Sequence, residues 1–309
     1  MNRLKLRPHS LYWLRSSASF PSLTQRLLFA TLPLVAPTAM QAQQQTPPGV
    51  QPQPNLIITE NFETGWDMGI QTQDHRCSNL EQMFSLVSTP VRSGQRALKT
   101  QITNCDERAE IVARTQFARD KTYWLGWSMY VPENYFKPGD SNAAFTIVQQ
   151  LVHFAPAWDY PNSFRLKCGN PPHSVMILNR TPTNDYLSYR VTYPVEFQHG
   201  VTTLDCQTYA IPLTKNQWQD FVMQVRLSES QTGFLKLWMN DTLYIDYQGP
   251  LLTQDRRFGP GDIKFGVYVG DPNRGERTVY FDDLKIGDAS ASYQAVRSEK
   301  VQFRQTLPQ

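Results

Sequence analysis

The sequence has little cysteine and histidine and almost no helical periodicity. The first scarcity argues against a structural metal site, and the second argues against a helical fold. Four cysteines and five histidines are spread over 309 residues without a CxxC pair, so the pattern does not indicate a structural metal site. No segment of a dozen residues carries an apolar stripe at helical spacing. The domain is therefore predicted to be nearly all β.

Long apolar runs are also scarce, and the one that exists lies near the start. The run Leu27–Met40 is broken by Pro33 and Pro37, which makes a retained membrane anchor the weaker alternative. It follows a basic segment and precedes the small residue Ala42, which is the pattern of an export signal. We expect residues 1–42 to be removed and the mature protein to be secreted or periplasmic, without membrane attachment. The basic residues of this segment are Arg3, Lys5, Arg7, Arg15 and Arg26.

The chain without this leader has no excess of basic residues. Removing residues 1–42 takes away five of the 30 basic residues and none of the 27 acidic ones, which leaves 25 against 27 and a net charge of −2. Nucleic-acid binding through a broadly basic surface is therefore not expected. A polyanion would have to be held by a local cluster of Arg and Lys.

The four cysteines are even in number and belong to a chain expected in an oxidising compartment, which favours disulfides. Four cysteines can form two disulfides in three ways. We favour Cys77–Cys105 with Cys168–Cys206, because each bond closes a local segment.

The chain after the leader divides into a linker, a domain and a tail. Residues 43–54 are rich in Gln and Pro and suit an extended linker, whereas residues 55–288 alternate strand patterns with turn residues. Residues 289–309 are predicted to be a polar, loosely held tail. The fold expected from this many strands is a single two-sheet antiparallel sandwich. The strands are expected at 56–62, 84–88, 96–102, 108–115, 122–131, 144–154, 163–168, 174–179, 186–193, 218–228, 233–240, 242–247, 263–269 and 278–286.

The strand 144–154 is unusual because polar groups interrupt its apolar sequence. Gln149, Gln150 and His153 lie where a core strand would carry more Val or Leu. Regular alternation would place Gln149 and His153 on one face and Gln150 on the other. The alternative to a functional role is a buried Gln and His that neighbouring groups satisfy.

Two further strands each combine an apolar face with a charged one. In residues 108–114, alternation places Arg108, Glu110 and Arg114 opposite Ala109, Ile111 and Ala113. In residues 262–269, Lys264, Gly266 and Tyr268 lie opposite Ile263, Phe265, Val267 and Val269. The alternative interpretation is a solvated sheet face whose Arg–Glu pair contributes little energy.

These three strands occur in the order found in the β-jelly-roll polysaccharide lyases, and the chain resembles the heparin-lyase-I-like and glucuronan lyase group, with alginate lyases as more distant relatives. Further motifs support the resemblance, which covers roughly residues 56–287. They are Asn61–Gly65, Arg92–Leu98, Trp124–Pro132 and Tyr280–Gly287.

The resemblance implies a jelly-roll sandwich with a concave groove that cleaves a uronic-acid-containing polysaccharide by β-elimination. Arg108 and Gln149 would neutralise the sugar carboxylate and stabilise the enolate that forms when the neighbouring proton leaves. His153 and Tyr268 would serve as base and acid. Lys264 would hold the acidic sugar, and Glu110 would orient Arg108. Arg114 and the loop histidine His75 are further candidates for substrate contacts.

The chain departs from its relatives in the histidine strand. They usually carry glutamine two residues before the histidine, where this chain has Leu151. Either a bulge places Gln150 on the active face or a regular strand places Gln149 there.

Two other functions compete with the lyase. A carbohydrate-binding sandwich without activity would use exposed aromatic residues such as Trp124, Tyr186 and Tyr189, and a sandwich glycoside hydrolase would need a carboxylate pair that no strand provides. The lyase chemistry needs no cofactor and no catalytic metal, and nothing indicates a structural calcium ion. We expect a monomer whose partner is an acidic polysaccharide.

Overall fold

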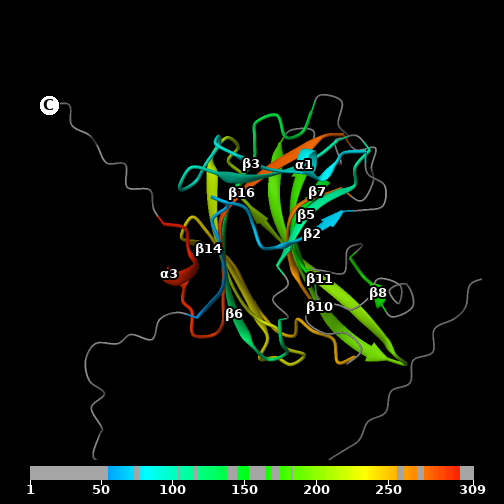
Figure 1. Ribbon diagram of the computed structural model, residues 1–309. Helices are drawn as coiled ribbons and strands as arrows, with labels where there is room; N and C mark the ends of the chain where they lie inside the picture. The colour runs from blue at the N-terminus through cyan, green and yellow to red at the C-terminus, as the bar shows by residue number, and fades with distance from the viewer. Residues whose placement is uncertain are drawn as a thin grey trace, which may run out of the picture. The chain divides into compact units, whose positions relative to one another are not determined.

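Alternating apolar side chains form strands throughout the folded part of the protein. The computed structural model describes residues 55–72, 77–103, 105–113, 117–137, 145–152, 164–168, 174–181, 184–255, 261–269 and 275–299. All of them belong to one contact unit, Val50–Gln309. The strands form two sheets that face each other, as Figure 1 shows.

The first sheet contains eight antiparallel strands. β1 (Leu56–Glu60) pairs with β16 outside the main order. That order is β14 (Thr242–Gln248), β13 (Phe234–Met239), β12 (Trp218–Arg226), β6 (Thr122–Tyr130), β16 (Arg277–Gly287), β4 (Ala97–Ile102) and β3 (Phe84–Val87).

The second sheet also has eight strands, and it carries the residues of interest for function. β8 runs parallel to β11, and the other described pairs are antiparallel. The order is β2 (Gly69–Thr72), β5 (Arg108–Ala113), β15 (Ile263–Tyr268), β7 (Phe145–Leu151), β9 (Ser174–Arg180), β10 (Asp185–Gln198), β11 (Val201–Ile211) and β8 (Phe164–Leu166).

The core fills the space between the two sheets. Trp127 on β6 stacks on Phe221 of the same sheet at 5.2 Å between ring centroids, and it contacts Phe265 of the second sheet at 5.4 Å. All three side chains are fully buried. Because large aromatic side chains bury much apolar area, these contacts hold the two layers together. The predicted all-β, two-sheet sandwich is confirmed.

Two strands escaped the sequence prediction, β2 and β11, and β10 extends beyond its predicted end. The strand was predicted over 186–193, and Pro194, which cannot donate a ladder hydrogen bond, follows that stretch. The strand instead continues through an irregularity between Pro194 and Glu196. It then turns into β11 at His199 and Gly200, whose φ angles of 52° and 76° suit a tight hairpin.

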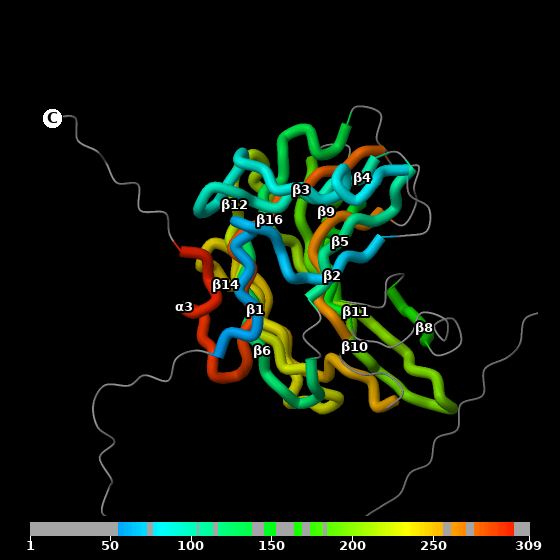
Figure 2. Tube along the Cα trace, viewed as in Figure 1, coloured from blue at the N-terminus to red at the C-terminus, as the bar shows by residue number. Residues whose placement is uncertain are grey.

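The prediction of a loose tail from residue 289 is wrong for residues 289–299. The helix α3 (Tyr293–Val296) lies on the outer side of the first sheet, as Figure 2 shows. Its buried Val296 belongs to the same apolar cluster as Val222 of β12 and Ala291. Gly126 on β6 makes this possible, since a Cβ there would collide with the carbonyl group of Val296. Between the predicted strands 56–62 and 84–88 the chain also forms the short helix α1 (Leu80–Met83).

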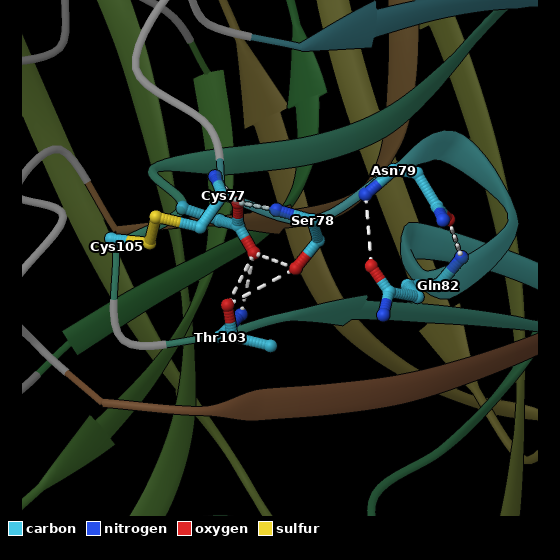
Figure 3. Close-up of a disulfide and its surroundings, with 7 residues drawn as sticks. Cys77, Ser78, Asn79, Gln82, Thr103 and Cys105 are labelled. Atoms are coloured by element: carbon cyan, nitrogen blue, oxygen red, sulfur yellow. Dashed lines mark hydrogen bonds between the residues drawn. A yellow bond between two sulfur atoms is a disulfide. The ribbon is translucent and has the colours of Figure 1, made fainter.

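Both predicted disulfides, Cys77–Cys105 and Cys168–Cys206, are present. Beside the first one, the buried carboxylate of Asp106 accepts hydrogen bonds from the backbone and side chains of Ser78 and Thr103, which lie together in Figure 3. Burial raises the pKa of Asp106, but these hydrogen bonds outweigh it and lower the pKa to about 2. The leader 1–42 and the linker 43–54 lie outside the described residues. No described helix has the length and apolar character needed to cross a membrane.

Candidate active site

β5 and β15 present the same polar face that alternation predicts. Ala109 and Ile111 on β5 and Phe265 and Val267 on β15 belong to the core. The residues that alternate with these core residues point away from the core. Across the two strands, Tyr268 pairs with Arg108 and Lys264 pairs with Val112. Because directly opposite residues share a face, the polar groups of both strands gather on the outer face of the second sheet. These groups are Arg108, Glu110, Lys264 and Tyr268.

β7 contributes Gln150 to this face because the strand contains an irregularity at Val148. Ile147 pairs with Ile177 of β9, yet Gln149 pairs with the adjacent Met176. β7 therefore has one residue more than β9 in this stretch, and the side chains after it point to the opposite faces from those that regular alternation predicts. Gln150 consequently lies opposite Lys264 and donates a hydrogen bond of 2.5 Å from its Nε2 to Glu110 Oε1.

The placement of Gln149 on the active face is therefore wrong. Its partners across the sheet, Phe265 and Met176, are core residues. Gln149 is fully buried, and neither its Nε2 nor its Oε1 has a hydrogen-bond partner in the described part of the chain. Of the two alternatives that the sequence left open, the bulge with Gln150 on the active face is the one that the structure adopts.

Glu110 is the buried centre of the polar cluster. Its side chain has no solvent exposure, and it lies 3.0 Å from Arg108 Nε and within hydrogen-bond distance of Gln150. Burial raises the pKa of Glu110, while the charges of Arg108 and Lys264 and the hydrogen bond from Gln150 oppose that rise. A carboxylate enclosed in this way fixes the position of its partners, which fits the predicted orienting role.

Arg108 lies between Glu110 and Tyr268. Its Cζ atom is 3.9 Å from the centroid of the Tyr268 ring, a close cation–π contact. Its Nε faces Glu110 at ion-pair distance, although the angle does not make a hydrogen bond. The Nη atoms of Arg108 and the hydroxyl of Tyr268 have no hydrogen-bond partner within the described part of the chain. Both groups can therefore bind a ligand without breaking an existing interaction.

Lys264 adds a second cation next to this cluster. Burial is the main cause that lowers the pKa of Lys264, and the charge of Arg108 lowers it further, whereas Glu110 and Asp262 raise it. The cluster thus has two cations, Arg108 and Lys264, with Glu110 and Asp262 as acidic residues near Lys264. The guanidinium and ammonium groups can donate charge-assisted hydrogen bonds to an anionic ligand.

Gly266 allows β15 to lie close to β5. Its φ of +150° is rare for other residues, and a Cβ at this position would collide with the carbonyl oxygen of Ala109. Gly266 pairs with Glu110 in the ladder, so this close approach lies at the centre of the cluster. The glycine thus permits the close packing of the two backbones.

An apolar patch, which we call the floor, lies beside the polar cluster on the same face. It consists of Ile147 on β7 with Val175 and Ile177 on β9, and Phe145 and Tyr268 pack against it. Beyond the floor, Arg190 of β10 pairs with Val175 and faces the same way. The sequence analysis missed Arg190, although its position between Tyr189 and Val191, both core residues, is a signal of outward orientation.

Three predicted residues, His153, Arg114 and His75, lie outside the described residues and stay predictions. The described residues include no group of three or more His, Cys, Asp or Glu side chains that could hold a metal ion. The six remaining candidates are described. Arg108, Gln150 and Lys264 lie around Glu110, and Tyr268 joins them through its contact with Arg108. Gln149 alone of the six faces the core.

Comparison with known proteins identifies the family. The sequence profile described as polysaccharide lyase matches residues 62–285. The crystal structure of the endo-β-1,4-glucuronan lyase from the fungus Trichoderma reesei is similar with a TM-score of 0.57 and 15% identity, over 77% of this chain and 96% of that chain. Alginate lyase Aly36B gives a TM-score of 0.48 and 11% identity, over 78% of this chain and 99% of that chain. No curated protein matches the sequence. Because the profile covers most of the chain, this protein belongs to the polysaccharide lyase family.

Proposed function

We propose that this enzyme cleaves a uronic-acid-containing polysaccharide by β-elimination and releases an unsaturated sugar end. The observation that carries the proposal is the gathering of Arg108, Gln150, Lys264 and Tyr268 around one buried carboxylate on the outer sheet face. Two cations and an amide suit a carboxylate substrate, and the tyrosine adds a group that can transfer a proton.

The difficult step is the removal of the C5 proton, because the adjacent carboxylate already bears a negative charge. The Nη atoms of Arg108 can bind both carboxylate oxygens, a bidentate geometry that favours arginine over lysine. Gln150 uses one amide N–H on Glu110 and has a second N–H for the substrate. These donors would stabilise the enolate-like charge of the transition state more than the ground state, which lowers the barrier.

The reaction then needs a base and an acid. The base takes the C5 proton, the electron pair forms the C4–C5 double bond, the C4–O4 bond breaks, and the acid protonates the departing O4. Tyr268 is well placed for one or both transfers because its ring lies against Arg108, which would hold the reacting sugar. His153 is the second candidate for these transfers. No metal is needed in this scheme.

The same reasoning favours an exported enzyme. The two disulfides suit an oxidising compartment, and polysaccharide substrates are too large to enter a cell readily. We propose that residues 1–42 are the export signal and that the mature protein acts outside the cytoplasm as a monomer.

The test is to incubate the purified mature protein with polyglucuronate, alginate and a neutral glucan. Polyglucuronate is the first choice because a solved structure similar to this chain, with a TM-score of 0.57, is a glucuronan lyase. We expect the ultraviolet absorbance of an unsaturated uronate to rise with at least one acidic polymer and not with the glucan. Reducing ends that appear without this absorbance would indicate hydrolysis and contradict the proposal. Binding without any cleavage would favour a carbohydrate-binding protein.

A further inference from the structure

Three aromatic side chains lie next to one another on the outer face of the first sheet. Trp218 of β12 pairs with Tyr130 of β6, and Tyr130 pairs on its other side with Tyr280 of β16. The ring centroids of Trp218 and Tyr130 are 5.6 Å apart, and those of Tyr130 and Tyr280 are 5.7 Å apart. The residues that flank Tyr130 and Tyr280 in their strands belong to the core, so these side chains point away from it. We call Trp218, Tyr130 and Tyr280 the aromatic row.

Packing in the core does not account for this row. All three side chains are partly exposed, and within the described part of the chain none of them belongs to, or packs against, a cluster of buried apolar residues. A second aromatic group on the same face is different, because Trp124 and Trp238 pack with Tyr293 of α3. Partly exposed aromatic side chains that gather without such a helix over them are typical of a binding surface.

A lysine extends the row by one strand. Lys99 of β4 pairs with Tyr280, and its neighbours Leu98 and Thr100 are fully buried, so the Lys99 side chain points to the same outer face. From Trp218 to Lys99 the row crosses the adjacent strands β12, β6, β16 and β4. With neighbouring strands about 4.8 Å apart, the two ends are separated by about 14 Å, which is enough for a few units of a sugar chain that lies across the strands.

Lys99 supplies the charge that selects the ligand. Among the described residues no acidic side chain lies within ion-pair distance of Lys99. The acidic residues two positions along from the row are bound by Arg92, whose guanidinium lies 2.7 Å from Asp220 and whose backbone N–H donates to Asp282. A carboxylate of a ligand can therefore accept a charge-assisted hydrogen bond from Lys99. A neutral sugar chain would leave this ammonium group without an anionic partner.

We propose that the aromatic row and Lys99 form a second binding surface for the acidic polysaccharide, separate from the active site. The C–H faces of the sugar rings would pack on the aromatic side chains, and Lys99 would bind a uronate carboxylate. The identity of the polymer rests on the proposed function. Because the core lies between the outer faces of the two sheets, the stretch of polymer on the row is not the stretch that is being cleaved. The surface therefore keeps the enzyme on a polymer network between cleavages, which raises the local concentration of substrate.

Trp218→Ala and Lys99→Gln test the inference, each with a matched control in the same sheet. Leu243→Ala removes an apolar side chain of β14 that is 44% exposed and lies outside the row. Lys236→Gln removes a positive charge from the outer face of β13. Circular dichroism and thermal unfolding first establish that all four variants are folded. If Trp218→Ala does not fold, Lys99→Gln and its control decide the question.

The measurement compares polyglucuronate immobilised on beads with the shortest soluble oligomer that wild type cleaves. We expect Trp218→Ala and Lys99→Gln to weaken retention on the beads, and to slow cleavage of the immobilised polymer, by about 10-fold, because the second contact is lost. Their kcat/KM for the oligomer should match wild type, since an oligomer in the active site does not reach the row. Both controls should match wild type on both substrates. Unchanged retention of either row variant, or an equal loss on both substrates, would overturn the inference.

Binding and cleavage separate this inference from the proposed function. If wild type is retained on the beads and cleaves nothing, the lyase proposal fails, and an about 10-fold loss of retention in the row variants still supports the second surface. If wild type cleaves the oligomer and the row variants are retained as well as wild type, the second surface is refuted and the lyase proposal stands. Equal retention of wild type on a neutral glucan would refute the role of Lys99 and with it the inference. A wild-type dimer that Trp218→Ala converts into a monomer in light scattering would show that the row binds a second copy of the chain, which would also overturn the inference.

Discussion

The adjacent residues Gln149 and Gln150 should respond in opposite ways to the same substitution. We consider Gln149→Met and Gln150→Met, because methionine is unbranched and close to glutamine in size, so each change removes an amide with little change in shape. Gln149 faces the core and its amide is unsatisfied. Gln150 faces the site and donates to Glu110.

The magnitudes follow from these two environments. A buried amide without hydrogen bonds costs roughly 1–3 kcal/mol, so Gln149→Met should stabilise the protein by up to that amount. Gln150→Met leaves Glu110 Oε1 unpaired where solvent cannot reach it. The loss of a hydrogen bond to a charged group should destabilise the protein by about 1.5–3 kcal/mol. In the lyase assay, Gln149→Met should keep near-wild-type turnover and Gln150→Met should lose most of it.

The assay combines thermal unfolding with turnover on the preferred polymer. For a domain of this size, 1 kcal/mol corresponds to about 2–4 °C in Tm, so the two variants should separate clearly on either side of wild type. A stable, active Gln150→Met together with an unstable, inactive Gln149→Met would show that β7 is regular. The bulge at Val148 and the site built on it would then be refuted.

Three other perturbations test the fold around the site. Asp106→Asn should lower the free energy of unfolding by about 1–2 kcal/mol at neutral pH. Because the pKa of Asp106 is lower in the folded than in the unfolded chain, this difference should shrink as pH falls from about 4 to about 2. Urea unfolding at several pH values measures it, and a constant difference would contradict the role of the carboxylate. Gly266→Ala should lower the free energy of unfolding by about 2–6 kcal/mol through collision and φ strain. Gly65→Ala, at φ +151° with open space around it, should show the strain alone. Equal unfolding midpoints of the two variants would argue against the close approach of β5 and β15. Thiol titration of the denatured, unreduced protein should detect almost no free thiol, and four free thiols would reject both disulfides.

The faces of β5 and β15 could be predicted because the ladder between these two strands is regular, although the pairing of β15 with β7 shifts between Phe265 and Tyr268. Each alternates apolar and polar residues without interruption, so the orientation of Arg108, Glu110, Lys264 and Tyr268 follows from a period of two. The sequence could not decide the orientation of β7. The bulge at Val148 is a property of pairing with β9, and a one-residue change in register turns every following side chain to the other face.

Other features failed because the local signal differed from the tertiary outcome. β11 is rich in Thr and polar residues, and only its pairing with β10 and the disulfide at Cys206 reveal a strand. The tail is polar in composition, yet Ala291, Tyr293 and Val296 are enough to pack α3 and the residue before its cap against the first sheet. Arg190 was missed because a single arginine between two core residues resembles any other outward-facing charge in a strand.

The most direct test of the account is turnover by Tyr268→Phe on an acidic polymer that wild type cleaves. The substitution removes only a hydroxyl that has no hydrogen-bond partner in the described residues, so folding should be preserved, and Phe can still pack on Arg108. If this hydroxyl transfers a proton, kcat should fall by at least about 100-fold while the affinity for the polymer, measured by calorimetry, stays near that of wild type. Wild-type kcat in Tyr268→Phe would show that Tyr268 has no part in proton transfer and would contradict the mechanism.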